Sequence, residues 1–162
     1  RVLFRSGSIS FFSTTSMENI KADNSQVMCV LNVPVGEIQF SVLIKSFHFQ
    51  KSLMEEHFNE NYMESDKFPK STFKGSIADF SKYDLSKNGS YTVAVSGNLT
   101  IHGVTKKVVT NGTVQVNTGK ITVQAKFPVR LADYNITIPK LVKDNIAENV
   151  DITVNCTLDQ KM

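Results

Sequence analysis

Along most of the chain, apolar and polar residues alternate with a period of two. The clearest stretches cover residues 36–46, 90–101, 120–131 and 148–159, and weaker ones cover 8–12, 26–32, 73–80 and 108–116. Alternation of this length is typical of a β-strand that buries one face and exposes the other to water. The pattern therefore predicts an all-β chain of about eight strands.

Short turn-forming pairs separate several of the predicted strands. They are Asn-Gly at 88–89, His-Gly at 102–103 and Thr-Gly at 118–119. Tight hairpins need positive φ at their central residues, which glycine adopts freely and histidine tolerates better than most residues. We therefore predict that His102 is a turn residue rather than a ligand or a base. Short links between alternating strands indicate antiparallel order and either a barrel or a sandwich.

Residues 52–63 carry the strongest helical pattern. Ser52 and Glu55 have the spacing of a capping box, and Pro69 prevents a longer helix. The side chains expected on the buried face are Leu53, Met54, His57, Phe58, Asn61 and Tyr62, and those expected to face water are Glu55, Glu56, Asn59, Glu60 and Met63. We expect Leu53, Phe58 and Tyr62 to dock this helix, and we predict a second, shorter helical segment near 140–147.

The same helix gathers acidic side chains around a histidine, which raises the question of a metal or acid–base site. A helical zinc motif of the HExxH type needs a second histidine four residues after the first, and Asn61 stands there. His57, Glu60 and His48 form the alternative set, which would serve a metal-assisted hydrolase. We favour a solvated acidic face, with no metal ligands and no catalytic residues.

Composition narrows the class of protein. A chain of 162 residues is long enough to fold as one domain without staples. The net charge of +3, without a basic face interleaved with aromatics, argues against nucleic-acid binding. No apolar run reaches the length of a membrane span, so we do not expect a membrane-spanning protein. We expect Cys29 and Cys156 to be buried thiols that act as small hydrophobes, with a disulfide as the alternative.

The first six residues, RVLFRS, stand apart from the rest. They have none of the three regions of a secretory signal. The same string results when a common sequencing adapter is translated in frame. We therefore expect residues 1–6 to be non-native and residues 7–162 to form a single domain.

Four stretches carry a resemblance to a known family. They are FHFQKSLMEEHFNENYMESDKFPKSTFKG (47–75), GNLTIHGVTKKV (97–108), KFPVRLADYNITIP (126–139) and VDITVNCTL (150–158). In this order they resemble the YceI-like domain, most closely its branch common in Bacteroidetes-type bacteria. The resemblance covers roughly Gly7 to the end. It implies an eight-stranded antiparallel lipocalin-like barrel around a long isoprenoid or fatty chain, with helices beside the mouth and a periplasmic or secreted location.

An eight-stranded barrel is just wide enough to be filled by side chains or to hold one slender ligand. Small residues on inward faces, namely Gly75, Gly97 and Ala125, would leave room for a ligand. The residues expected to bind lipid are Phe40, Val42, Ile44, Phe73, Val93, Val95, Leu99, Val123, Phe127, Val129, Ile152 and Val154 in the lumen, with Phe58 and Tyr62 closing it from the helix.

These expectations favour a non-enzymatic protein that carries or sequesters an isoprenoid-type lipid, or an isoprenoid quinone, and uses no other cofactor. The alternatives are the metal-assisted hydrolase described above and a stress-related structural module with a filled barrel. A homodimer is left open.

Overall fold

A computed structural model describes residues 2–15, 19–32, 35–83, 87–137, 146 and 148–159. The strands in this part of the chain are β1 (Val2–Thr14), β2 (Asn19–Asn32), β3 (Glu37–Leu43), β4 (His48–Phe49), β5 (Lys70–Ile77), β6 (Gly89–Ile101), β7 (Val104–Asn117), β8 (Lys120–Arg130) and β9 (Asn149–Asp159). The helical elements are η1 (Ile44–Ser46), α1 (Ser52–His57), η2 (Phe58–Tyr62), η3 (Phe80–Lys82) and η4 (Leu131–Tyr134).

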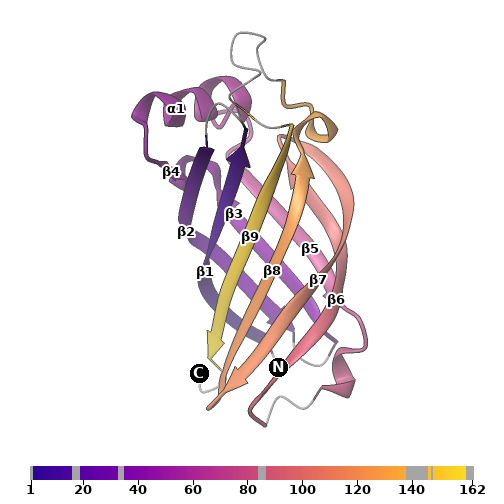
Figure 1. Cartoon of the computed structure of the whole chain (residues 1–162). Coiled ribbons are helices and arrows are strands. Elements are labelled where there is room, and N and C mark those ends of the chain that lie inside the picture. Colours follow the sequence, from indigo (N-terminus) through magenta and orange to yellow (C-terminus); the bar gives the residue numbers. More distant parts are fainter. Residues whose placement is uncertain are drawn as a thin grey trace.

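The strands form one antiparallel sheet that closes on itself. Its hydrogen-bonded order is β1-β9-β8-β7-β6-β5-β3-β2-β4, and an additional pairing of β1 with β2 completes the ring. The two-residue β4 pairs with β2 outside this ring, so the barrel has eight strands, as predicted. Figure 1 shows α1, η2 and η4 at one end of the barrel, while η3 lies at the other end, where β1 begins and β9 ends.

The predicted turns close two of the hairpins. His102 and Gly103 both have positive φ (54° and 75°) between β6 and β7, and Thr118 and Gly119 do the same (50° and 84°) between β7 and β8. Two successive residues with positive φ match the twist of antiparallel strands, which is why two-residue hairpins favour them. The prediction that His102 is a turn residue is confirmed.

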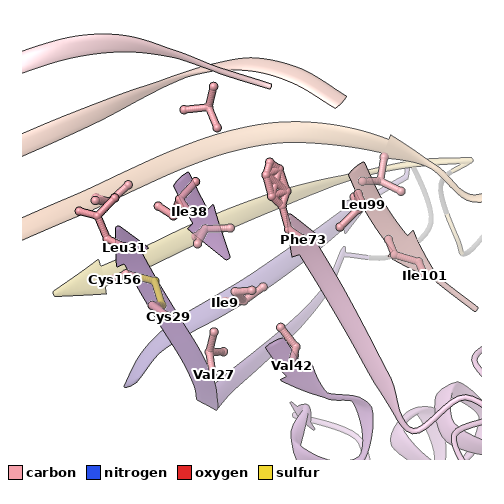
Figure 2. Packing of buried hydrophobic residues seen from close by; sticks show 14 of the residues in the cluster. Ile9, Val27, Cys29, Leu31, Ile38, Val42, Phe73, Leu99, Ile101 and Cys156 are labelled. Carbon is pink, nitrogen blue, oxygen red and sulfur yellow. A yellow bond between two sulfur atoms is a disulfide. The ribbon is translucent and has the colours of Figure 1, made fainter. Parts of the chain in front are cut away.

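Side chains fill the end of the barrel that lies opposite α1 (Figure 2). The large side chains packed there are almost fully buried: Val27, Leu31, Ile38, Val93, Val114, Val116, Ile121, Val123 and Leu158. They come from the inward positions of six strands, as the period-two pattern requires. This half of the barrel is an ordinary close-packed core.

The two cysteines lie in this packed half and are joined by a disulfide, with their Cα atoms 6.5 Å apart. The expectation of two free thiols was therefore wrong. Cys29 on β2 and Cys156 on β9 are 127 residues apart in sequence. Both strands flank β1, and this proximity across a closed barrel leaves no trace in local periodicity.

The predicted helix at 52–63 exists but changes type in the middle. Residues 52–57 are α-helical and residues 58–62 form a π-helical turn, in which the Met63 amide donates to the Phe58 carbonyl. The capping box was wrong, because Lys51 is the N-cap residue and the Glu55 carboxylate instead accepts from the Phe49 amide at 3.1 Å.

The wider π-helical turn also changes the direction of the side chain that follows it. A π-turn adds one residue to the helical repeat, so every later side chain is rotated relative to the α-helical expectation. Met63, expected in water, is accordingly buried. Leu53 lies before the π-turn, and the expectation that it docks the helix was wrong, because its side chain is 63% exposed. Phe58 is buried as predicted.

Three further expectations concern irregular or terminal segments. The predicted helical segment near 140–147 falls outside the described residues, apart from the buried Ile146. Ile44, expected on a strand, begins the 3-10 helix η1 instead. Residues 2–6 pair with β2 as part of β1, and the expectation that residues 1–6 are non-native stays a prediction. Within the described residues, no helix is both long and apolar enough to cross a membrane.

Candidate functional site

A cavity occupies the half of the barrel next to α1 and η2. Empty space among its side chains, including the open mouth, totals about 1310 Å³, and about 150 Å³ of this can hold the centre of a water-sized sphere.

Among the described residues, those that line the cavity carry no ionisable group except the phenol of Tyr62. The barrel strands contribute Ile9, Phe11, Ser13, Ile20, Phe40, Val42, Ser71, Thr72, Phe73, Val95, Leu99, Ile101, Val108, Thr110, Ala125, Phe127, Val129, Val150, Ile152 and Val154. Segments at the mouth contribute Ile44, Phe47, Met54, Phe58, Tyr62, Met63, Leu131, Ile136 and Ile146. With no Lys, Arg, His, Asp or Glu in this set, the cavity offers no partner for a buried charge.

All of the predicted lumen residues except Val93 and Val123 line this cavity. Those two point inward but lie in the packed half, where they are 1% and 3% exposed. That the remaining residues bind lipid stays a prediction. Of the three small residues expected to leave room, only Ala125 lines the cavity; Gly75 is covered by the Phe73 ring, which a Cβ would meet at 2.6 Å.

A cluster of aromatic rings lies where the cavity meets α1 and η2, which together form the helical cap. Phe58 packs on Phe11, Phe47 and Phe49 with ring centroids 5.4, 5.6 and 4.9 Å away. Offset and edge-to-face pairs at such distances add to the stability that burial provides. Sequence reasoning included Phe58 but missed the other three, although the spacing of Phe47 and Phe49 around His48 was a visible signal.

Besides apolar side chains, the cavity wall includes the hydroxyl-bearing residues Ser13, Tyr62, Ser71, Thr72 and Thr110. The Ser71 Oγ is buried and has no hydrogen-bond partner among the described residues. Tyr62 also lines the cavity, and its partial burial raises the pKa of its phenol, so the hydroxyl stays neutral at ordinary pH.

The rim of the cavity is held by the imidazole ring of His102. Its Nε2 lies 2.9 Å from Glu64 Oε1, and its Nδ1 lies 3.1 Å from the Tyr134 carbonyl oxygen. Phe68 packs edge-on against the same ring with centroids 4.8 Å apart. The side chain of His102 is 10% exposed. Its contacts therefore form a nearly buried junction between the segment that follows η2 and the end of η4.

The structure does not gather a metal site from the alternative set of His57, Glu60 and His48. Among the described residues, no group of three or more His, Cys, Asp or Glu side chains could hold a metal ion. His48 Nδ1 instead faces Glu55 Oε1 at 3.8 Å on the outside of the cap. These side chains therefore form no metal centre, and the cavity is the candidate site.

Comparison with known proteins places this geometry in context. The model of the YceI-like domain family matches residues 4–158. A search of curated proteins gave no significant match.

Several solved structures share the fold. One is a polyisoprenoid binding domain from Saccharophagus degradans implicated in plant cell wall breakdown, with a TM-score of 0.84 at 17% identity over 98% of each chain. Another is BcnA of Burkholderia cenocepacia, with a TM-score of 0.76 at 18% identity over 93% of this chain and 95% of that one. The YCEI protein of Campylobacter jejuni gives a TM-score of 0.71 at 13% identity over 92% of this chain and 90% of that one. At these identities the likeness shows the fold alone.

Proposed function

Because the chain belongs to the YceI-like domain family, we propose that its barrel binds a long-chain isoprenoid or related lipid and carries or sequesters it without chemical change. The observation that supports this proposal most strongly is the cavity, whose described wall residues carry no charge. The relative from Saccharophagus degradans, described as a polyisoprenoid binding domain, supports the choice of ligand class.

Burial of the chain alone would supply the affinity. Each methylene moved from water into an apolar site contributes about 0.8 kcal/mol. A flexible chain of many carbons could therefore bind well with no catalytic group and no ion pair. The branched methyl groups of an isoprenoid would pack against the Val, Ile, Leu and Phe side chains of the walls.

A non-enzymatic role agrees with the chemistry of the walls. Nucleophilic catalysis needs an activated side chain next to a base, and in the part of the chain that the structure describes no acidic or basic side chain lines the cavity. The YceI-like polyisoprenoid-binding family is also not known as enzymatic.

We further propose a periplasmic or secreted location for this carrier. Disulfides persist in oxidising compartments and are rare in the cytosol. The buried bond between Cys29 and Cys156 therefore supports a protein that folds outside the cytoplasm.

Organic extraction of the purified protein, followed by mass spectrometry, tests the proposed ligand class. We expect a lipid with repeating five-carbon units at close to one molecule per chain. Preparations from several expression hosts that yield no lipid, and that take up none when incubated with geranylgeraniol, would refute the proposal.

A further inference from the structure

His102 joins two segments that each form part of the cavity rim. On one side, Glu64 follows Met63, whose buried side chain lines the cavity. On the other side, Tyr134 ends η4 two residues before Ile136, which also lines the cavity. The two segments are far apart in sequence, and the imidazole ring links them directly.

Both partners of the ring accept hydrogen bonds. The Tyr134 carbonyl can only accept, and an ionised Glu64 carboxylate can only accept. A neutral imidazole has one N–H group, so it can donate to one of them while its other nitrogen turns a lone pair towards the second. Hydrogen bonds to both acceptors at once therefore require one additional proton, bound either to the imidazole ring or to the Glu64 carboxylate.

We propose that His102 is a proton-dependent latch on the cavity mouth, which holds the rim segments 63–68 and 131–136 together when the extra proton is bound and loosens them when it is lost. This inference rests on the proposed function only for its consequence, the regulation of lipid exchange. Because a lower pH favours binding of the extra proton, the latch would close on the acidic side and loosen on the alkaline side.

The groups around the ring determine the electrostatics of this step. From the segment that follows η2, the Glu64 carboxylate faces Nε2, and the Lys67 ammonium lies 4.0 Å from the other oxygen of Glu64. Phe68 contributes only its ring, and Asp66 pairs with Lys45.

From η4, the ring meets the Tyr134 carbonyl, and the Asp133 carboxylate is the charge that acts on the Tyr134 phenol. Burial raises the pKa of the Tyr134 phenol and the Asp133 carboxylate adds to this, so the phenol stays neutral between pH 5 and pH 8. On the hairpin of β6 and β7, the residue after His102 is Gly103, which carries no charge. Within the described residues, Glu64 is therefore the charge that the ring contacts.

Two variants separate a proton-dependent latch from a merely structural contact. In Glu64→Gln, the amide can donate to Nε2 of a neutral ring, or accept from a protonated one, so both contacts survive at every pH. In His102→Asn, the side chain tolerates the positive φ of the turn but is too short to bridge the two segments. The first variant should stay closed and the second should stay open.

Hydrogen exchange of the ligand-free protein tests the latch without any lipid. Amide protection in 63–68 and 131–136, corrected for intrinsic exchange rates, should fall about three- to tenfold from pH 5.5 to pH 8 in the wild type. Glu64→Gln should keep the high protection at both pH values, and His102→Asn should show the low protection at both. Equal protection in all three proteins, or a change of both variants in the same direction, would overturn the inference.

Release of the neutral fluorophore N-phenyl-1-naphthylamine into phosphatidylcholine vesicles then measures the consequence. We expect about three- to tenfold faster release at pH 8 than at pH 5.5 in the wild type, and no pH dependence in either variant. A wild-type protein that binds no fluorophore would contradict the proposed function, whereas the exchange data would still decide on the latch. Binding with pH-independent release would contradict the latch alone.

Discussion

Cys29 and Cys156 are joined across strand β1 at the position of Gly7. Gly7 pairs with Cys156, and a Cβ at Gly7 would meet the Asn155 carbonyl oxygen at 2.5 Å and the Cys156 Sγ at 2.8 Å. The Cys156 end of the disulfide, drawn in Figure 2, thus occupies part of the space that a side chain at Gly7 would need. It ties both neighbours of the terminal strand to each other at the packed end of the barrel.

Removal of this covalent tie should cost stability and leave the cavity in place. We expect the double variant Cys29→Ala/Cys156→Ala to lose roughly 2–5 kcal/mol of unfolding free energy. Thermal unfolding followed by circular dichroism should show a melting temperature lower by about 5–15 °C. Thiol titration of the wild type in guanidinium chloride without reductant provides the control, and two free thiols per chain there would contradict the disulfide.

Asn24 supports the irregular part of the seam between β1 and β2. The pairing of β1 with β2 shifts its register between Gly7 and Ile9, and Ile9 pairs with Asn24. The Asn24 side chain donates to the Leu43 carbonyl and accepts from the Gln26 amide, both at 2.8 Å. Asn24→Ala leaves both backbone groups without these partners, so we expect a loss of roughly 2–4 kcal/mol in urea denaturation. Asn98→Ala on an exposed position of β6 is the matched control, and an equal effect of the two would refute this role.

Phe58 and Leu53 lie on neighbouring turns of the cap and make opposite predictions. Phe58 is buried among other phenylalanine rings, so Phe58→Ala should cost about 3–5 kcal/mol. Leu53 is largely exposed, so Leu53→Ala should change the free energy of unfolding by less than about 0.5 kcal/mol. Guanidinium denaturation of both variants checks this, and a large effect at Leu53 would contradict the exposed position of its side chain.

Ser71 carries an unpaired hydroxyl in the cavity wall. Because an unpaired buried polar group is unfavourable, Ser71→Ala should leave the empty protein equally stable or stabilise it by roughly 1 kcal/mol. The exposed Ser90→Ala on β6 serves as the control in the same thermal unfolding experiment. A clear loss of stability at Ser71 alone would mean that the hydroxyl has a partner in the empty barrel.

Local patterns in the sequence predicted the strands and their inward faces well. A strand has a period of two whatever surrounds it, and paired turn residues with positive φ are needed wherever two such strands form a tight hairpin. Periodicity fixes the face of a residue but not its depth along the barrel axis. Val93 and Val95 share one face of β6, yet Val93 lies in the packed half and Val95 lines the cavity.

The features missed in the sequence depend on contacts between distant residues or on backbone irregularity. The disulfide joins residues separated by 127 positions, and His102 contacts Glu64 and Tyr134, which are 38 and 32 positions away. The π-helical turn at 58–62 rotated Met63 from the expected wet face into the cavity wall. None of these relations changes the spacing of apolar residues, so spacing could not reveal them.

The central claim is that the cavity is the binding site, and a titration with retinol, a fluorescent isoprenoid alcohol, tests it most directly. Ala125→Phe places a ring in the cavity, whereas Ala94→Phe makes the same change on the exposed face of β6. We predict that the wild type and Ala94→Phe bind one retinol per chain and that Ala125→Phe binds at least about tenfold more weakly while remaining folded. Equal affinity of a folded Ala125→Phe, or no binding by the wild type, would contradict the claim.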